Sequence, residues 1–163
     1  MPRVRAVEDL AGSFRGLEPF AAVRDMTEMV YREFAYRAGV TDVTTSIEYV
    51  VHARQGVCQD FAHILIGLCR ALDIPARYVS GYVFGSHAHP PNRGDGASHA
   101  WVEAFTPTHG WRGFDPTNNL MANDHYIKIA IGRDYRDVAP TRGTYRGAAT
   151  EHMTVEVATR ELD

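Results

Sequence analysis

The segment of residues 58–72, CQDFAHILIGLCRAL, constrains the fold more than any other part of the chain. Strong helix formers and apolar residues dominate this segment, and Pro75 prevents a helix from continuing beyond it. Apolar side chains recur at helical spacing along one stripe, formed by Phe61, Leu65, Leu68 and Leu72. Because a helix this apolar is normally buried against a sheet, the rest of the chain must supply that sheet.

The sequence predicts helices first and strands afterwards. An amphipathic pattern predicts a helix from Pro19 to about Arg37, which Gly39 ends, and a capping box at Thr45 and Glu48 predicts a second helix. That second helix should run to about residue 53. Five later segments have the pattern of strands: 77–84, 98–106, 111–115, 125–131 and 153–158. This order predicts an α+β fold, with helices packed on one side of an antiparallel sheet.

Length and composition bound the domain organisation. The chain has 163 residues, 45% of them hydrophobic and 23% charged, which is typical of a globular protein and predicts a single domain over residues 1–163. Residues 1–18 are expected to be loosely structured, and the Gly- and Pro-rich residues 85–97 are expected to form a loop.

Charge and hydropathy exclude several classes of partner. The formal net charge is −3 and the arginines are scattered. The sequence therefore has no basic cluster of the kind that indicates nucleic-acid binding. No segment approaches the roughly 20 apolar residues of a membrane span. The first residues, MPRVRAVEDL, contain no apolar core of a signal peptide, and we therefore expect a cytoplasmic protein.

Cys58 is a candidate nucleophile because it follows a glycine turn and begins the apolar helix. The free amides and the dipole at a helix N-terminus favour a thiolate, although the negative charge of Asp60 works modestly against this. The same amides could donate to an oxyanion at an attacked carbonyl. Cys69 lies eleven residues further on, roughly 16 Å along a helix, so the two thiols cannot form a disulfide with each other.

His99 and Asp115 are the candidate partners of Cys58, because a thiolate needs an imidazole and the imidazole needs an orienting acceptor. If residues 98–106 and 111–115 form a hairpin with a loop at 106–108, His99 faces Asp115. Directly opposed residues share one face of the sheet, with Cβ atoms about 5 Å apart. A bulge at Gly110 would change this register.

Four motifs together resemble the core of bacterial transglutaminase-like proteins: GVCQDFAH (56–63), ARYVSGY (76–82), SHAWVE (98–103) and GFDPTN (113–118). The later segment GRDYRDVAPTRGTYRG (132–147) is similar to the tail of that group. The resemblance implies a papain-like core on which Cys58 is the nucleophile, His99 the general base and acid, and Asp115 the residue that orients His99. Members often carry a β-rich domain ahead of this core, and fewer than twenty residues precede the first predicted helix here.

The implied reaction is amide-bond chemistry through a thioester, on a protein or peptide substrate and without a cofactor. We expect hydrolysis by a cysteine peptidase or amidase, partly because no calcium-site pattern is present. A protein-glutamine transferase and a non-catalytic binding module on the same fold are the alternatives. The sequence does not predict an oligomeric state.

The remaining candidates concern substrate and metal. Trp101, Tyr82 and Gln59 are candidate substrate-binding residues, and Gln55 or Gln59 could contribute to an oxyanion hole. His87 and His89 could join His99 in a zinc site, but no further ligand pattern completes a tetrahedron, so no metal site is expected.

Overall fold

A computed structural model of the chain describes residues 4–84 and 98–140, together with residues 143, 146, 147, 157, 158 and 160. The helices are α1 (Arg5–Ala11), a 3-10 turn η1 (Gly12–Phe14), α2 (Pro19–Glu33), α3 (Ile47–Ala53), α4 (Cys58–Ala71) and α5 (Tyr135–Val138). The strands are β1 (Ala35–Tyr36), β2 (Gln55–Gly56), β3 (Ala76–Val83), β4 (His99–Thr106), β5 (Gly110–Asp115), β6 (Leu120–Met121) and β7 (Tyr126–Gly132).

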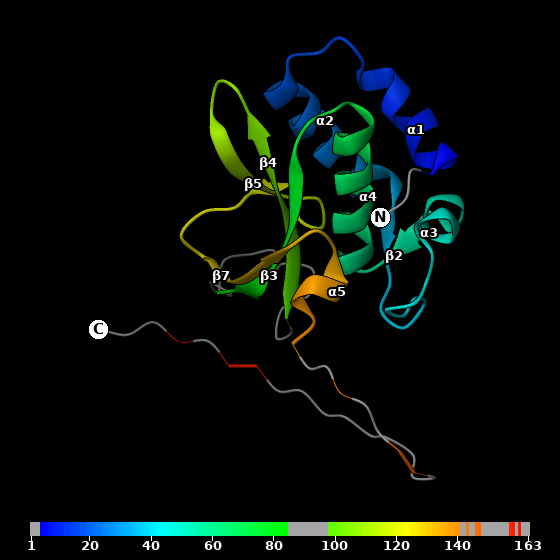
Figure 1. Cartoon of the computed structure of the whole chain (residues 1–163), viewed down its shortest axis with the longest axis vertical. Helices are drawn as coiled ribbons and strands as arrows, with labels where there is room; N and C mark the ends of the chain where they lie inside the picture. Colours follow the sequence, from blue (N-terminus) through cyan, green and yellow to red (C-terminus); the bar gives the residue numbers. More distant parts are fainter. Residues whose placement is uncertain are drawn as a thin grey trace.

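Five of these strands form one antiparallel sheet in the order β6-β5-β4-β3-β7. Helices α1 to α4 gather on one side of it, with α4 nearest the central strands (Figure 1). The predicted α+β architecture is therefore confirmed, and the apolar helix lies where its composition requires. The predicted loop at 85–97 and nearly all of the predicted strand at 153–158 lie outside the described residues.

The core lies between α4 and one face of the sheet. On β4, Ala100, Val102 and Ala104 belong to the buried apolar cluster that also holds the inner face of α4. Because side chains alternate along a strand, His99, Trp101 and Glu103 project from the opposite face. One strand thus supplies both the support for the helix of the candidate nucleophile and the candidate general base.

The expectation of a loose N-terminal segment was wrong. Residues 5–11 form α1, whose Val7 and Ala11 are buried in the core cluster against α4. Seven residues are too few to form a stable helix alone, so this helix depends on tertiary packing that the local sequence pattern does not reveal. None of the helices in the described part of the chain combines the length and apolarity needed to cross a membrane.

The region between the first helices also differs from the prediction. Helix α2 ends at Glu33 instead of about Arg37, because the chain enters β1, which pairs in parallel with β2. Helix α3 is capped by Ser46, whose hydroxyl accepts the Tyr49 amide at 3.2 Å. The Thr45 hydroxyl instead accepts the Asp42 amide at 2.9 Å, so it is not the cap.

The hairpin between β4 and β5 has a register two residues away from the predicted one. Phe105 pairs with Trp111, where the prediction paired Glu103 with Trp111. The cause is a longer turn, in which the His109 amide donates to the Thr106 carbonyl at 3.3 Å and Gly110 follows with φ 66°. A turn followed by a left-handed glycine is typical of three-residue hairpin loops. An even shift keeps every side chain on its predicted face.

Candidate active site

Cys58 is the first residue of α4, so its amide is one of the four that have no partner within the helix. Asp60 fixes this helix start, because its Oδ2 accepts the Val57 amide at 2.8 Å and the Thr41 hydroxyl at 2.6 Å. Gly56 is required for this arrangement, since a Cβ there would lie 2.6 Å from the same oxygen. The turn before Cys58 is therefore held by the side chains of Asp60 and Thr41, with a glycine where a Cβ would clash.

The two cysteines of the chain are both free thiols in different surroundings. Cys58 is partly exposed, whereas Cys69 is buried in the core cluster on the same helix. Burial raises the pKa of the Cys69 thiol to about 12. Only Cys58 is therefore placed to react with a substrate.

His99 and Asp115 form a buried pair, with His99 Nε2 and Asp115 Oδ2 2.8 Å apart. Extending the hairpin pairing by one residue puts Asp115 level with Trp101, so His99 lies diagonally across from it. Diagonal neighbours on one face are still within reach of longer side chains. The predicted contact is therefore present, although the predicted register was wrong.

Asp115 accepts donors on both carboxylate oxygens and is fully buried. Its Oδ1 accepts the backbone amides of Thr117 at 2.8 Å and Asn118 at 3.3 Å. Its Oδ2 accepts the Asn118 side-chain amide and the Tyr126 hydroxyl, each at 2.8 Å, in addition to His99. A buried carboxylate with this many donors is held in one orientation and stays ionised.

The electrostatics favour a charged His99 beside a charged Asp115. Burial opposes the imidazolium, but the hydrogen bond to Asp115 and its charge outweigh burial and raise the pKa of His99 to about 10. Hydrogen bonding with the Cys58 side chain and its charge raise this pKa further. Because Nε2 is engaged by Asp115, the nitrogen left for Cys58 is Nδ1.

The pKa of Asp115 moves in the opposite direction. Burial alone would raise it, but the charge and the hydrogen bond of His99 outweigh burial and lower it. The side-chain donors of Asn118 and Tyr126 lower it further. The arrangement can thus keep an imidazolium between the Asp115 carboxylate and the Cys58 sulfur.

The three candidate substrate-binding residues lie in different environments. Trp101 is only 1% exposed, and its ring stacks beside His99 with centroids 6.2 Å apart. Its indole is therefore covered by protein and shields the His99–Asp115 pair. Tyr82 on β3 and Gln59 on α4 are partly exposed and remain candidates for substrate contact.

Two residues of this site escaped the sequence analysis. Tyr126 and Asn118 both donate to Asp115, from β7 and from the turn after β5. Asn118 stands three residues after Asp115, and the run Asp-Pro-Thr-Asn at 115–118 is a local signal for a turn that side chains stabilise. Tyr126 has no such signal, because its strand reaches the site only through the pairing of β7 with β3.

The suggested metal site cannot be assembled from the described residues. His87 and His89 lie outside them, and no group of three or more metal-ligating side chains occurs among those that the structure describes. The acyl-transfer chemistry that a Cys–His–Asp arrangement can perform needs no metal.

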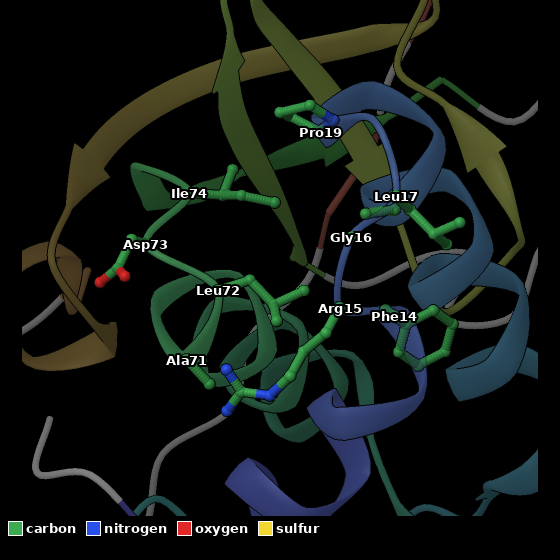
Figure 2. Close-up of a pocket in the computed structure, with 10 residues that line it drawn as sticks. Phe14, Arg15, Gly16, Leu17, Pro19, Ala71, Leu72, Asp73 and Ile74 are labelled. Carbon is green, nitrogen blue, oxygen red and sulfur yellow. The ribbon is translucent and has the colours of Figure 1, made fainter.

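Two cavities lie near α4 without including Cys58. One of about 230 Å³ lies between the segment from Phe14 to Pro19 and the C-terminal end of α4 (Figure 2). This end is about 20 Å from Cys58 along the helix. The other, of about 570 Å³, is lined by residues in or next to α3, α4 and α5, among them Glu48, Asp60 and Asp134.

Comparison with known proteins places these features in a family context. The family model described as the transglutaminase-like superfamily matches residues 8–116. An uncharacterized protein of Mycobacterium tuberculosis is 41% identical over 145 residues, which cover 83% of this chain and 46% of that protein. The chain therefore spans about half the length of the curated relatives it matches.

Two further relatives carry functional descriptions. The crystal structure of a "putative cysteine protease" from Cytophaga hutchinsonii matches with a TM-score of 0.69 and 39% identity, covering 82% of this chain and 44% of that one. A protein-glutamine gamma-glutamyltransferase of Pseudomonas aeruginosa is 32% identical over 123 residues, which cover 71% of this chain and 18% of that protein.

Proposed function

The chain belongs to the transglutaminase-like superfamily, and we propose that it is a cysteine-nucleophile enzyme that hydrolyses amide bonds as a peptidase or amidase. Cys58 is the proposed nucleophile, His99 the general base and acid, and Asp115 the residue that orients His99. The proposed substrate is a protein or a peptide. The cytoplasmic location expected from the sequence stays a prediction.

One observation carries this proposal. The buried His99–Asp115 pair, with its 2.8 Å contact, lies within interaction range of a partly exposed thiol at a helix start. The pair gives His99 a fixed orientation and a raised pKa, and the helix start supplies amides that can face a developing oxyanion. A nucleophile, a base and an orienting carboxylate in this relation support acyl transfer.

The reaction begins when the Cys58 thiolate attacks the carbonyl carbon of the substrate amide. A new S–C bond forms and the carbonyl electrons move to oxygen, giving a tetrahedral oxyanion. The C–N bond then breaks while His99 gives its proton to the leaving amine, which leaves a thioester. Water attacks the thioester, His99 accepts its proton, and the free acid and the Cys58 thiolate are released.

A second candidate is transfer of the acyl group to a primary amine instead of water. The similarity to the Pseudomonas aeruginosa enzyme named a protein-glutamine gamma-glutamyltransferase supports it. The first steps are the same, so the residues of the site do not distinguish the two outcomes. Hydrolysis is proposed first because the Cytophaga hutchinsonii protein, described as a "putative cysteine protease", is 39% identical to this chain, against 32% for the transferase.

The partition of the acyl group tests this assignment. A panel of peptide p-nitrophenyl esters would be added to the chain with and without a millimolar fluorescent primary amine, and products would be identified by mass spectrometry. We expect an acyl adduct on Cys58, absent in Cys58→Ala, and mainly free acid as product. Mainly amide product would contradict hydrolysis in favour of transfer, and no adduct on Cys58 would contradict the nucleophile.

A further inference from the structure

Three side-chain donors converge on a single oxygen of Asp115. His99 Nε2, Asn118 Nδ2 and the Tyr126 hydroxyl each lie 2.8 Å from Oδ2. Asn118 is a near neighbour of Asp115 in the chain, whereas Tyr126 comes from the strand at the far edge of the sheet. The local turn therefore explains the contact of Asn118 with Oδ2, but it does not explain the contact of the Tyr126 hydroxyl.

We propose that Tyr126 is a positioning residue of this site, which shares Asp115 Oδ2 with His99 and so limits how strongly the carboxylate retains the His99 proton. The inference deepens the proposed function and rests on it. In this proposal, Tyr126 adjusts the acidity of His99, which protonates the leaving amine, in addition to supporting the fold.

The ring of Tyr126 is held from two sides. The backbone of Tyr126 pairs with Val83 at the end of β3. The ring of Tyr126 packs edge-on against the Trp101 ring, with centroids 5.2 Å apart. It also lies 6.3 Å from the His99 ring. These contacts fix the direction of the hydroxyl, so the hydrogen bond to Asp115 does not depend on a mobile side chain.

Tyr126 can only act as a donor here. Burial raises its pKa well above the ordinary value for tyrosine, and the negative charge of Asp115 raises it further. The Tyr126 hydroxyl therefore stays protonated over the pH range in which a thiolate can act as a nucleophile. Donation withdraws electron density from Oδ2, which leaves less for the bond that His99 makes to the same atom.

The titratable groups that act on His99 come from two elements, Asp115 of β5 and Cys58 of α4. The groups that act on Asp115 are His99 and Tyr126, and the neutral Asn118 adds a further donor. Among these, only Tyr126 can lose its donor by deletion of one oxygen with the ring retained. This makes Tyr126→Phe the sharpest available change.

Retention of the proton matters because His99 must release it to the leaving amine. An imidazolium held too tightly by Asp115 would be a weak acid at that step. Because Tyr126 shares Oδ2, Asp115 holds the His99 proton less strongly, while the buried pair still keeps the His99 ring oriented. The geometry thus reconciles a firmly placed histidine with one that gives up its proton.

The test is a ¹⁵N NMR titration of the His99 ring in the Cys58→Ala chain, with and without Tyr126→Phe. We expect the His99 titration to move upward by on the order of half a pH unit to one unit, as expected for losing part of a charged hydrogen bond. Tyr49→Phe, which removes a hydroxyl from a tyrosine that is 52% exposed on α3, should leave the titration unchanged. An unchanged His99 titration in a folded Tyr126→Phe chain would overturn the proposal.

A second variant keeps the proposal testable if Tyr126→Phe does not fold. Site-specific replacement of Tyr126 by 3-fluorotyrosine strengthens the donor and should move the His99 titration downward; an upward or absent shift would contradict the sharing of Oδ2. Because these titrations use Cys58→Ala, they do not depend on acyl transfer. Failure of the proposed function would appear instead as a missing acyl adduct on Cys58 in the wild-type chain.

Discussion

The two ends of α4 carry the same reactive group in opposite surroundings. At the N-terminal end, Cys58 is partly exposed beside His99, at a turn held by the carboxylate of Asp60. Towards the C-terminal end, Cys69 is fully buried among apolar side chains, and burial raises its pKa to about 12. The contrast teaches that a single helix can present one thiol at a candidate site and use another for packing, because the two ends have different environments.

The histidines near this helix repeat the contrast. His63 on α4 has its pKa lowered to about 4 by burial, because the weaker attraction of Asp134 does not compensate. His99 is more deeply placed, yet Asp115 raises its pKa to about 10. A bonded carboxylate therefore reverses the effect of burial on an imidazole.

Replacement of each cysteine is the strongest way to break the comparison. Cys58→Ala should lower turnover of an activated peptide ester by at least about 10³-fold, because it removes the proposed nucleophile. Cys69→Ala should keep turnover near the wild-type value and lower the free energy of unfolding by about 1 kcal/mol, through the small cavity left in the core. Steady-state rates and urea unfolding check both variants.

Circular dichroism would show whether both variants keep the fold. Retained turnover in a folded Cys58→Ala chain would contradict the assignment of the nucleophile. Loss of turnover in a stable, folded Cys69→Ala chain would remove the proposed distinction between the two thiols.

The pH dependence of stability sharpens the comparison of the histidines. The raised pKa of His99 means that its contribution is fully present below about pH 6.5 and is lost as the pH rises towards 10. The lowered pKa of His63 means that its contribution is present above about pH 6.5 and is lost as the pH falls towards 4. Urea unfolding between pH 4 and 10 measures both.

Single variants assign each limb of that profile. His99→Gln should flatten the alkaline loss of stability, and His63→Gln should flatten part of the acid loss, where the carboxylates also contribute. If His63→Gln instead removed the alkaline loss, the two environments would have been assigned the wrong way round.

Much of the fold could be predicted because its main elements have strong local patterns. The apolar stripe of α4 and the break at Pro75 define the central helix, and the alternating strands define the sheet. Helix α1 was missed because seven residues depend on packing against α4 for their stability. The predicted hairpin register was wrong because residue spacing alone does not select the longer turn that ends at Gly110.

The candidate site was predictable only in part, because some of its contacts depend on strand pairing and not on local motifs. Cys58, His99 and Asp115 lie in local motifs, and the even register shift kept His99 and Asp115 on one face and in contact. Tyr126 could not be found in this way, because only the pairing of β3 with β7 brings it to Asp115. Trp101 was expected at the substrate, but it is 1% exposed, and its ring packs against His99 and Tyr126, a contact that depends on strand pairing.

The rate of alkylation by iodoacetamide at neutral pH tests the central claim most directly, with peptide mass spectrometry reading each cysteine separately. We expect Cys58 to be labelled at least about tenfold faster than Cys69 in the folded chain, because only Cys58 is accessible and paired with an imidazolium. The difference should largely disappear in urea, and His99→Gln should slow Cys58 alone. Equal labelling of both cysteines in the folded chain, or a Cys58 rate that His99→Gln leaves unchanged, would contradict the account.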